Sequence, residues 1–278
     1  MKLSLSRIVV LTVFILAAAF AAQAQATRTW VSGKGDDANA CTRTTPCKTF
    51  AGAITKTSVN GEINCLDAGG FGPVVINKAI TIDCTGNYGS ILSNTNASVA
   101  VSINIASGPN TVRLRGLSIT GQSVGAFGVR IFAATKVLIE DSVIDGFTNH
   151  GVSLESTTGT TQLMIANSAL QNNSGNAINI VPGGTASAMV SVIHSQLFGN
   201  YTGIVAQTAD VAVTDCLISG NSFGIATGNG GIIRLSGDTI SENTTGINSS
   251  KGQILSYANN SLTGNGTNGS PTGQIGLQ

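Results

Sequence analysis

The stretch that decides the fold runs from residue 189 to residue 243 and contains MVSVIHSQLFGN (189–200), DVAVTDCLISGN (210–221) and IIRLSGDTISEN (232–243). Four more segments of the same form lie at 111–122, 136–147, 162–173 and 254–265. The ninth residue of each segment is Ile or Leu, and these residues are Ile119, Ile144, Leu170, Leu197, Ile218, Ile240 and Leu262. The chain therefore repeats one unit every 21 to 27 residues over its C-terminal two thirds.

Apolar and polar residues alternate inside each segment, which is the period of a β-strand. The second and fourth residues are apolar in the first six segments and are Leu255 and Tyr257 in the seventh. A further apolar position follows each of the first six segments, at Val129, Val152, Ile178, Ile204, Ile225 and Ile247. Such a unit cannot bury its apolar side chains alone, so equivalent units must stack. The pattern predicts an all-β solenoid, a parallel β-helix of roughly nine coils and about 40–45 Å in length.

Two other repeat architectures fit the pattern poorly. Leucine-rich repeats have a similar period but carry a Leu/Asn pattern that is missing here. Propeller blades are longer, at about 40–45 residues, and carry a Trp-Asp signature that is also missing.

Two polar columns accompany the apolar ones. The last residue of the segment is Asn173, Asn200, Asn221, Asn243 or Asn265 in five of the seven cases. We expect these asparagines to occupy left-handed corners and to form a ladder of stacked side-chain amides. Two residues before the ninth position stand Ser142, Ser168, Ser195, Cys216, Asp238 and Asn260. This column is expected to face inward, with Cys216 as a buried thiol in place of a serine.

The first 26 residues have the features of a secretory signal peptide. Lys2 and Arg7 precede an apolar run from Ile8 to Phe20, and small residues suitable for cleavage follow. The run is shorter than the roughly 20 residues of a membrane span. We therefore expect a secreted or periplasmic mature protein that does not span a membrane. The predicted organisation is a signal peptide (1–26), an N-terminal strand and capping segment (27–60), a parallel β-helix (61–266) and a C-terminal tail (267–278).

Charged residues make up only 10% of the chain, and its formal net charge is +1. Proteins that bind nucleic acid by neutralising phosphates carry a large positive charge, so nucleic acid is not an expected partner. The sequence contains no phosphate loop, dinucleotide fingerprint, zinc motif or nucleophile elbow. We accordingly expect no bound cofactor and no structural metal.

Four of the five cysteines lie near the start of the expected mature chain. In an oxidising compartment, Cys41, Cys47, Cys65 and Cys84 can form two disulfides, with three pairings open. The preferred pairing is Cys41–Cys47, which closes a small loop, and Cys65–Cys84, which joins two neighbouring strands. A metal site is a weaker alternative, because the spacings are not those of paired C-x-x-C motifs.

The serine and asparagine columns, the Gly-Ile position and the period together resemble right-handed parallel β-helix proteins of the pectate-lyase-like superfamily. The stretch TWVSGKGDDANACTRTTPCKTFAGAI (29–54) is similar to the opening that often precedes such domains. The resemblance covers roughly Thr29 to Gly266 and implies a short helix, here Lys48 to Thr55, that caps the N-terminal end. Because the superfamily contains lyases, hydrolases, epimerases, adhesins and inert domains, the resemblance is specific for fold and poor for function.

The resemblance to lyases of this fold implies an Arg or Lys base and acidic residues that hold calcium. The most charged stretch of the chain supplies the candidates Arg113, Arg115, Glu140, Asp141 and Asp145. Arg115 and Glu140 occupy equivalent positions in successive segments, so they should face each other across about 4.8 Å. An exposed ion pair without catalytic function explains the same residues.

A second candidate site is the column three residues before the ninth position, where Asp141, Asn167, His194 and Asp215 would stack over four coils. This polar stripe could hold sugar hydroxyls or a cation. A preference of the strand corner for small hydrogen-bonding residues explains it equally well. His194 has no carboxylate near it in sequence, and Asp215 lies one coil on. The grouped aspartates, Gly-His and Arg-x-Lys motifs of hydrolases of this fold, and the Asp-Pro-His pattern of alginate epimerases, are missing.

These observations favour an exported, non-enzymatic β-helix module that presents a polar face to a glycan or cell-envelope partner. One alternative is a polysaccharide lyase that uses an Arg base and a carboxylate-bound Ca²⁺. The other is a structural or adhesive surface protein. Of the aromatic residues, Phe127, Phe132, Phe147, Phe198 and Phe223 are candidates for a sugar-binding surface, although packing in the core or at corners explains most of them. The open C-terminal end of the helix predicts either a monomer or an end-to-end dimer.

Overall fold

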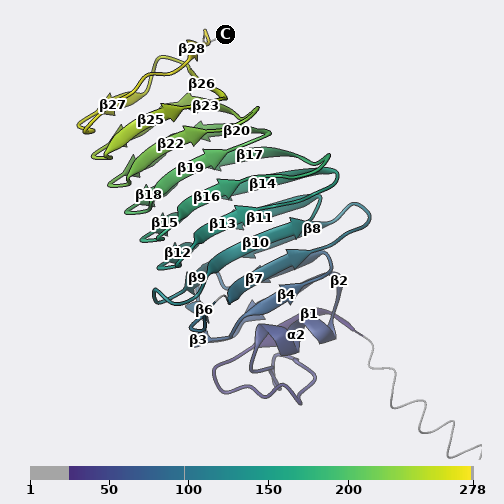
Figure 1. Ribbon diagram of the computed structural model, residues 1–278. Helices are drawn as coiled ribbons and strands as arrows, with labels where there is room; N and C mark the ends of the chain where they lie inside the picture. Colours follow the sequence, from purple (N-terminus) through teal and green to yellow (C-terminus); the bar gives the residue numbers. More distant parts are fainter. Residues whose placement is uncertain (1–24, 97, 277–278) are drawn as a thin grey trace, which may run out of the picture.

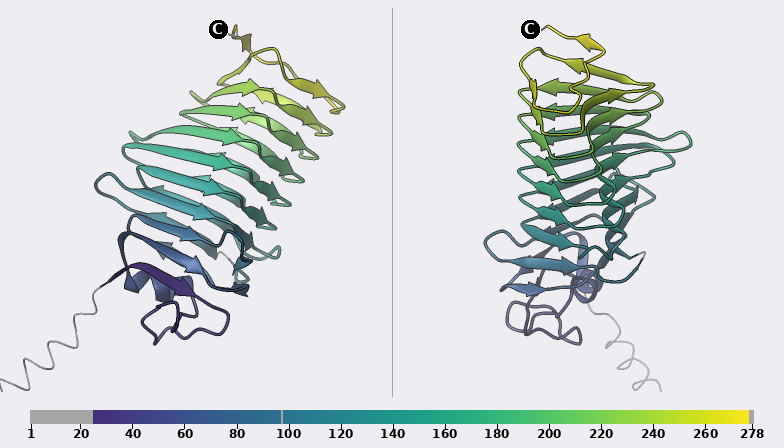
Figure 2. Two further views of the ribbon diagram at one scale, coloured as in Figure 1. Left: turned by 180° about the vertical axis from the view of Figure 1, so that it is seen from behind. Right: turned by 60° about the vertical axis from the view of Figure 1, so that its left-hand side comes forward.

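The computed structural model describes residues 25–96 and 98–276, and the predicted signal peptide lies almost entirely outside this range. The chain winds into a solenoid whose coils each cross three parallel sheets (Figure 1). The sheets contain eleven, nine and eight strands, so about eight turns are complete on all three sides, one fewer than the predicted nine. The two turned views in Figure 2 show the coils stacked from the N-terminal cap to the C-terminal end.

We refer to the sheets as A, B and C in the order in which each coil meets them. Sheet A consists of β1 (Ala26–Val31), β2 (Thr57–Cys65), β5 (Ile80–Asp83), β8 (Thr111–Arg115), β11 (Lys136–Glu140), β14 (Thr160–Ala166), β17 (Ser187–Ile193), β20 (Ala209–Thr214), β23 (Ile232–Ser236), β26 (Gln253–Ser256) and β28 (Gly273–Gln274). Sheet B consists of β3 (Gly69–Gly70), β6 (Gly89–Leu92), β9 (Leu117–Thr120), β12 (Val143–Asp145), β15 (Ala169–Gln171), β18 (Gln196–Phe198), β21 (Leu217–Ser219), β24 (Thr239–Ser241) and β27 (Ser261–Thr263). Sheet C consists of β4 (Val74–Ile76), β7 (Val99–Asn104), β10 (Phe127–Ala133), β13 (His150–Leu154), β16 (Asn176–Ile180), β19 (Thr202–Ala206), β22 (Phe223–Thr227) and β25 (Thr245–Ser249).

The repeat register predicted from the sequence is confirmed in sheets B and C. In sheet B, the ninth residues of the segments pair from coil to coil, as in Ile144 with Leu170 and Leu197 with Ile218. In sheet C, Val152 pairs with both Val129 and Ile178, as the third apolar position requires. Side chains from these columns fill one continuous core along the solenoid axis.

The predicted register is wrong in sheet A of the last segment, where Ile233 pairs with Ile254 and Leu235 pairs with Ser256. Leu255 and Tyr257 were expected at these positions, but they lie partly exposed. The corner after β26 takes up one extra residue, and Ala258 holds its left-handed backbone at φ 64°. This shift keeps the Tyr257 hydroxyl out of the core, where it would need a hydrogen-bond partner.

The asparagine column stands at the corner between sheets B and C and forms a continuous hydrogen-bonded ladder. The side-chain Nδ2 of each asparagine donates to Oδ1 of the next one, at 2.8 to 3.1 Å, over the series Asn173, Asn200, Asn221, Asn243 and Asn265. Each Oδ1 from Asn200 onward also accepts the backbone N–H of the preceding asparagine, as Asn221 does from Asn200 at 2.8 Å. The amides therefore satisfy backbone groups that the sharp corner removes from the sheets.

The expectation of left-handed backbone at the ladder asparagines is wrong. The positive φ angle belongs instead to the residue just before the ladder position, which is Gly146, Asn172, Gly199, Gly220, Glu242 or Gly264. The ladder side chains point inward, and a residue before them makes the turn. Glycine at four of these six positions reflects its freedom at positive φ.

The serine column forms a second buried ladder at the corner between sheets A and B. Ser168 Oγ accepts the backbone N–H of Ser142 at 3.2 Å and donates to the Ala166 carbonyl at 2.8 Å. Cys216 takes the same position with its thiol buried, and burial raises the pKa of that thiol to about 11. Such a thiol is unreactive at neutral pH.

The N-terminal end of the solenoid is closed by α2 (Phe50–Lys56) and two disulfides. Phe50, Ala53 and Ile54 of α2 are buried against the first coil, and Thr49 caps the helix by accepting the Gly52 N–H at 2.9 Å. The preferred pairing is confirmed: Cys41 is bonded to Cys47, and Cys65 to Cys84. In the described part of the chain, α2 is too short to cross a membrane, and no other helix there is long and apolar enough to do so.

Replacement of a ladder asparagine should destabilise the fold. In Asn221→Ala, the backbone N–H of Asn200 and the Leu197 and Ser219 carbonyls lose their partner in a buried corner. We expect a loss of about 3 kcal/mol in the free energy of unfolding, measured by urea denaturation. Asn259→Ala, at an exposed asparagine, is the control and should change it by less than about 0.5 kcal/mol. Equal losses in the two variants would contradict a special role for the ladder.

Asp238 should make stability depend on pH. Its carboxyl is only 1% exposed in the serine column, and burial raises its pKa from 3.8 to about 7. The folded state therefore holds a proton that the unfolded state has released, so the free energy of unfolding should fall from about pH 4 to pH 7, by up to about 1.4 kcal/mol per pH unit. In Asp238→Asn, which supplies the side chain that Asn260 has one coil on, this fall should disappear.

The measurement is chemical denaturation of both proteins between pH 4 and pH 8.5. The variant should be more stable than the wild type at pH 8 and similar to it at pH 4. Parallel pH profiles for the two proteins would show that Asp238 ionises normally in the folded state.

Candidate functional site

Three of the residues singled out by the lyase hypothesis lie together on the outer face of sheet A. Arg115 pairs in register with Asp83 on one side and with Glu140 on the other. Its guanidinium approaches Asp83 Oδ2 at 3.3 Å and Glu140 Oε2 at 3.5 Å. Arg113 Nε approaches the same Glu140 oxygen at 3.2 Å. The Nε atoms of Arg113 and Arg115 and Oε2 of Glu140 are shielded from solvent. Their contacts are ion pairs without the geometry of a hydrogen bond.

The other two lyase candidates lie elsewhere. Asp141 occupies the corner between sheets A and B with φ 51°, and its side chain is exposed. Asp145 is on sheet B, where its Oδ1 accepts a hydrogen bond from Asn172 Nδ2 at 2.8 Å. The sequence did not show that these two aspartates lie away from the arginines, because one segment passes from sheet A through a corner to sheet B.

These residues do not fit a calcium site. Asp83 and Glu140 stand on the two coils that flank Arg115, so a guanidinium occupies the position between the carboxylates. Across residues 25–96 and 98–276, no three His, Cys, Asp or Glu side chains group closely enough to ligate one ion. We therefore derive no reaction step through calcium.

The predicted polar stripe follows the corner between sheets A and B. Asp141, Asn167, His194 and Asp215 all adopt positive φ angles between 48° and 52°, and Gly116 and Gly237 continue the column. Left-handed backbone favours Asn, Asp and Gly, so the corner itself explains most of the stripe. A shallow depression of about 420 Å³ borders Asp141, Asn167 and His194.

The structure brings together one pair in this stripe that the sequence did not predict. His194 Nε2 lies 3.4 Å from Asp215 Oδ2 on the next coil, and both side chains are more than half exposed. Such an exposed pair contributes little to stability.

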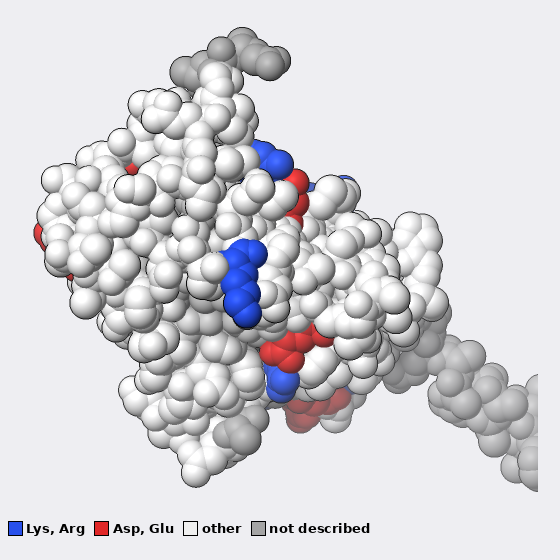
Figure 3. All heavy atoms as spheres, turned by 45° about the horizontal axis from the view of Figure 1, so that its top comes forward, with Lys and Arg blue, Asp and Glu red and all other residues white. Residues whose placement is uncertain are grey.

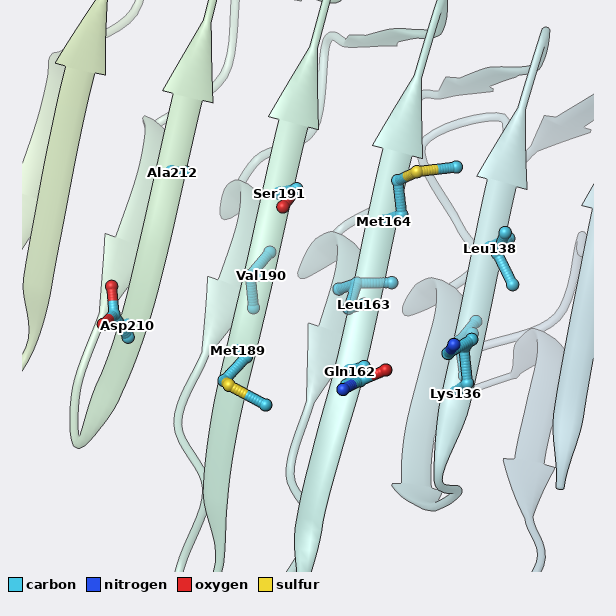
Figure 4. Close-up of a pocket in the computed structure, with 11 residues that line it drawn as sticks. Lys136, Leu138, Gln162, Leu163, Met164, Met189, Val190, Ser191, Asp210 and Ala212 are labelled. Atoms are coloured by element: carbon cyan, nitrogen blue, oxygen red, sulfur yellow. The ribbon is translucent and has the colours of Figure 1, made fainter. Parts of the chain in front are cut away.

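Arg113, Arg115, Asp83 and Glu140 are called the arginine cluster. A groove crosses the outer face of sheet A next to this cluster, and the sequence did not predict it. Figure 4 shows one row of side chains on successive strands, namely Lys136, Gln162, Met189 and Asp210. A second row consists of Leu138, Met164, Ser191 and Ala212. The groove has a volume of about 450 Å³, and an adjoining depression shares Met189 and Asp210 and continues to Ile232.

Side-chain size explains the groove. Ser191 and Ala212 are short, whereas the neighbouring Met164 and Met189 are long, so the surface is hollowed between them. Leu138 and the two methionines supply apolar lining, and Lys136, Gln162, Ser191 and Asp210 supply polar lining. These residues are the first and third residues of four successive segments. The sequence did not reveal the groove, because outward positions follow no repeating residue type.

Charged residues are few in the groove, where Lys136 and Asp210 are the charged members of the lining. On the face of the molecule seen in Figure 3, Lys, Arg, Asp and Glu side chains are likewise scattered among uncharged ones. Asp210 is paired with Arg234 on the next coil. Lys136 takes part in no ion pair among the described residues and is exposed at the groove edge.

The outer face of sheet C carries a polar network that is complete in itself. Arg130 donates to both carboxylate oxygens of Glu155 at 2.7 to 3.2 Å, and Ser153 Oγ donates to the same group at 2.7 Å. The Arg130 guanidinium also lies 4.3 Å from the Phe127 ring centroid and 4.7 Å from that of Phe132. These two phenylalanines therefore pack on protein groups, and Phe147 is buried in the core.

Comparisons with known proteins agree with this architecture. No family model matches the chain, and no curated protein matches it in sequence. Among solved structures, the crystal structure of pectate lyase Pel9A is similar, with a TM-score of 0.65 over 84% of this chain and 69% of that one. The chain has the pectate-lyase-like β-helix fold. Because the two proteins are only 12% identical, the likeness of this β-helix to the lyase concerns the fold alone.

Glu140 should stabilise the arginine cluster of the β-helix. In Glu140→Gln, Arg113 and Arg115 would face each other without their shared anion, and we expect a loss of about 2 kcal/mol in the free energy of unfolding. Asp210→Asn, which breaks the more exposed pair with Arg234, should cost less than about 1 kcal/mol. Thermal or urea unfolding at low salt would measure both. Similar losses would show that burial of the Glu140 oxygen does not matter.

Proposed function

We propose that the protein is an exported, non-enzymatic β-helix module that binds an extended glycan in the groove on sheet A. The observation that carries the proposal is the shape and lining of this groove, which runs across four successive coils from Lys136 to Asp210. The two disulfides and the signal-like N-terminal sequence support export, because disulfides persist in oxidising compartments.

An open, elongated groove suits a linear polymer better than a small molecule, which is usually enclosed by its site. Coils repeat about every 4.8 Å, so a chain lying along the solenoid axis meets a new set of side chains on every coil. Its apolar C–H faces would lie over Leu138, Met164 and Met189. Its hydroxyl or carboxylate groups would meet Lys136 and Gln162, and Ser191 in the hollow.

A binding role accounts for the arginine cluster more simply than catalysis does. A base that abstracts a proton must be unprotonated and within reach of the substrate. Arg115 is held between two carboxylates, and Arg113 contacts one of them. To act as a base, either arginine would first have to leave these contacts.

The test is glycan binding by a variant with a filled groove. Ser191→Trp places a large ring in the hollow between Met164 and Met189, and it should weaken binding at least tenfold. Ala226→Trp is the matched control, since it adds the same ring at a half-exposed position on the outer face of sheet C. Calorimetric titration with polygalacturonate, alginate and neutral polysaccharides would measure the affinities. Binding that survives Ser191→Trp unchanged would place the glycan elsewhere.

Polysaccharide lyase activity is the second candidate function, favoured by the position of the arginine cluster beside the groove. The test is absorbance of unsaturated uronides with acidic polysaccharides and calcium. A rise in absorbance, with or without added calcium, that Arg115→Ala abolishes would replace the non-enzymatic proposal by the lyase one.

A further inference from the structure

Three aromatic residues lie at or next to the corner between sheets B and C, on the coils of β18–β19 and β22. Phe198 ends β18, Tyr201 precedes β19 and Phe223 begins β22. Phe198 is 49% exposed and Tyr201 is 54% exposed, although large apolar side chains are usually covered. We call Phe198, Tyr201 and Phe223 the aromatic corner. It lies outside the groove on sheet A, whose lining contains none of these residues.

The next coil holds both exposed rings in place. The Phe198 ring packs against Gly220, where an added Cβ would lie 2.9 Å from Phe198 Cε2. Tyr201 makes an edge-to-face contact with Phe223, with ring centroids 5.6 Å apart and ring planes at 70°. Rings fixed before a ligand arrives lose little conformational entropy on binding. Both rings thus contact the next coil and keep ring area open to solvent.

Amides border the aromatic corner. Gln171 flanks Phe198 in register on the preceding coil, whereas Ser219, in register on the following coil, is only 5% exposed. Asn172 lies next to Gly199, with its Oδ1 2.9 Å from where a Cβ on that glycine would stand. The amides of Gln171 and Asn172 carry both donors and acceptors.

The charged groups that contact this rim are acidic. Asp145 accepts a hydrogen bond from Asn172 Nδ2 at 2.8 Å, and Glu242 accepts one from Ser219 Oγ at 3.3 Å. Carboxylates accept hydrogen bonds from sugar hydroxyls but repel uronate carboxylates. The aromatic corner therefore differs in charge from the groove on sheet A, where Lys136 is exposed and takes part in no ion pair among the described residues.

We propose that the aromatic corner is a second binding site, specific for a neutral sugar. The negative face of an aromatic ring attracts the polarised C–H groups of a pyranose, and the neighbouring amides and carboxylates match its hydroxyls. The site neither requires the groove on sheet A nor shares a residue with it, so the two proposals stand or fall separately.

The experiment titrates the full mature protein with cellohexaose, mannohexaose and a β-1,4-galactan hexamer, and with a galacturonate hexamer as the acidic comparison. Binding is followed by calorimetry and by NMR of the aromatic side chains. At least one neutral oligosaccharide should bind saturably and shift the Tyr201 and Phe223 signals. Tyr201→Ala and Phe198→Ala should each weaken this binding about tenfold or more.

Two controls make the result specific. Tyr88→Ala removes an exposed tyrosine outside the aromatic corner and should leave the affinity unchanged. Ser191→Trp fills the groove on sheet A and should also leave it unchanged. Retention of neutral-sugar binding in Ser191→Trp supports the corner site even when no polysaccharide binds the groove.

Three outcomes would overturn the proposal. The first is that none of the neutral hexamers binds, and the second is that the galacturonate hexamer binds the corner as tightly as they do. The third comes from sedimentation: a wild-type dimer that Tyr201→Ala converts to a monomer would make the corner an interface between two copies of the chain. Circular dichroism of each variant confirms that the comparison is between folded proteins.

Discussion

Each coil of this protein must place its inward side chains directly above those of the coil before it, because the strands of all three sheets pair in parallel from coil to coil. A residue that fails to match its predecessor would leave a void or a clash in a core only a few side chains wide. The columns of Ile, Leu and Val satisfy this requirement in sheets B and C. The last coil also follows this requirement. One extra residue at its corner shifts the register, so that Ser256 and not Tyr257 takes the inward position.

The corners obey the same constraint with polar groups. Backbone N–H and C=O groups that turn away from the sheets are buried, so they need partners that recur on every coil. The asparagine and serine ladders supply them. The identity of a ladder residue can vary while its hydrogen bond is kept, as Cys216, Asp238 and Asn260 show. Asp238 is the residue of this column that destabilises the fold when it ionises, because burial disfavours its charged form.

Outward side chains need not match from coil to coil, and they are the side chains that a ligand can reach. Coil-to-coil register nevertheless decides which of them meet. The register places Asp83, Arg115 and Glu140 side by side on three coils, so that they form one ion cluster. It also places Met164, Ser191 and Ala212 side by side, and a groove forms there. At the opposite corner it places Phe198 against Gly220 and Tyr201 against Phe223. The first surface combines an exposed Lys136 with paired charges, and the groups that contact the second are acidic, so one scaffold presents two faces of different chemistry.

The sequence by itself determined the strand period, the asparagine column and the repeat register up to the last coil, because all of these repeat along the chain. It favoured the observed disulfide pairs by local spacing, and the structure selected them from three possible pairings. It also showed that Arg115 and Glu140 face each other. Only the tertiary structure decided that Asp141 and Asp145 leave the arginines, that His194 meets Asp215, and that a groove and an aromatic corner exist. Inward positions are restricted to a few residue types by burial and can be recognised in one sequence. Outward positions accept almost any residue, so their meaning depends on neighbours about one coil away, more than 20 residues distant in the chain.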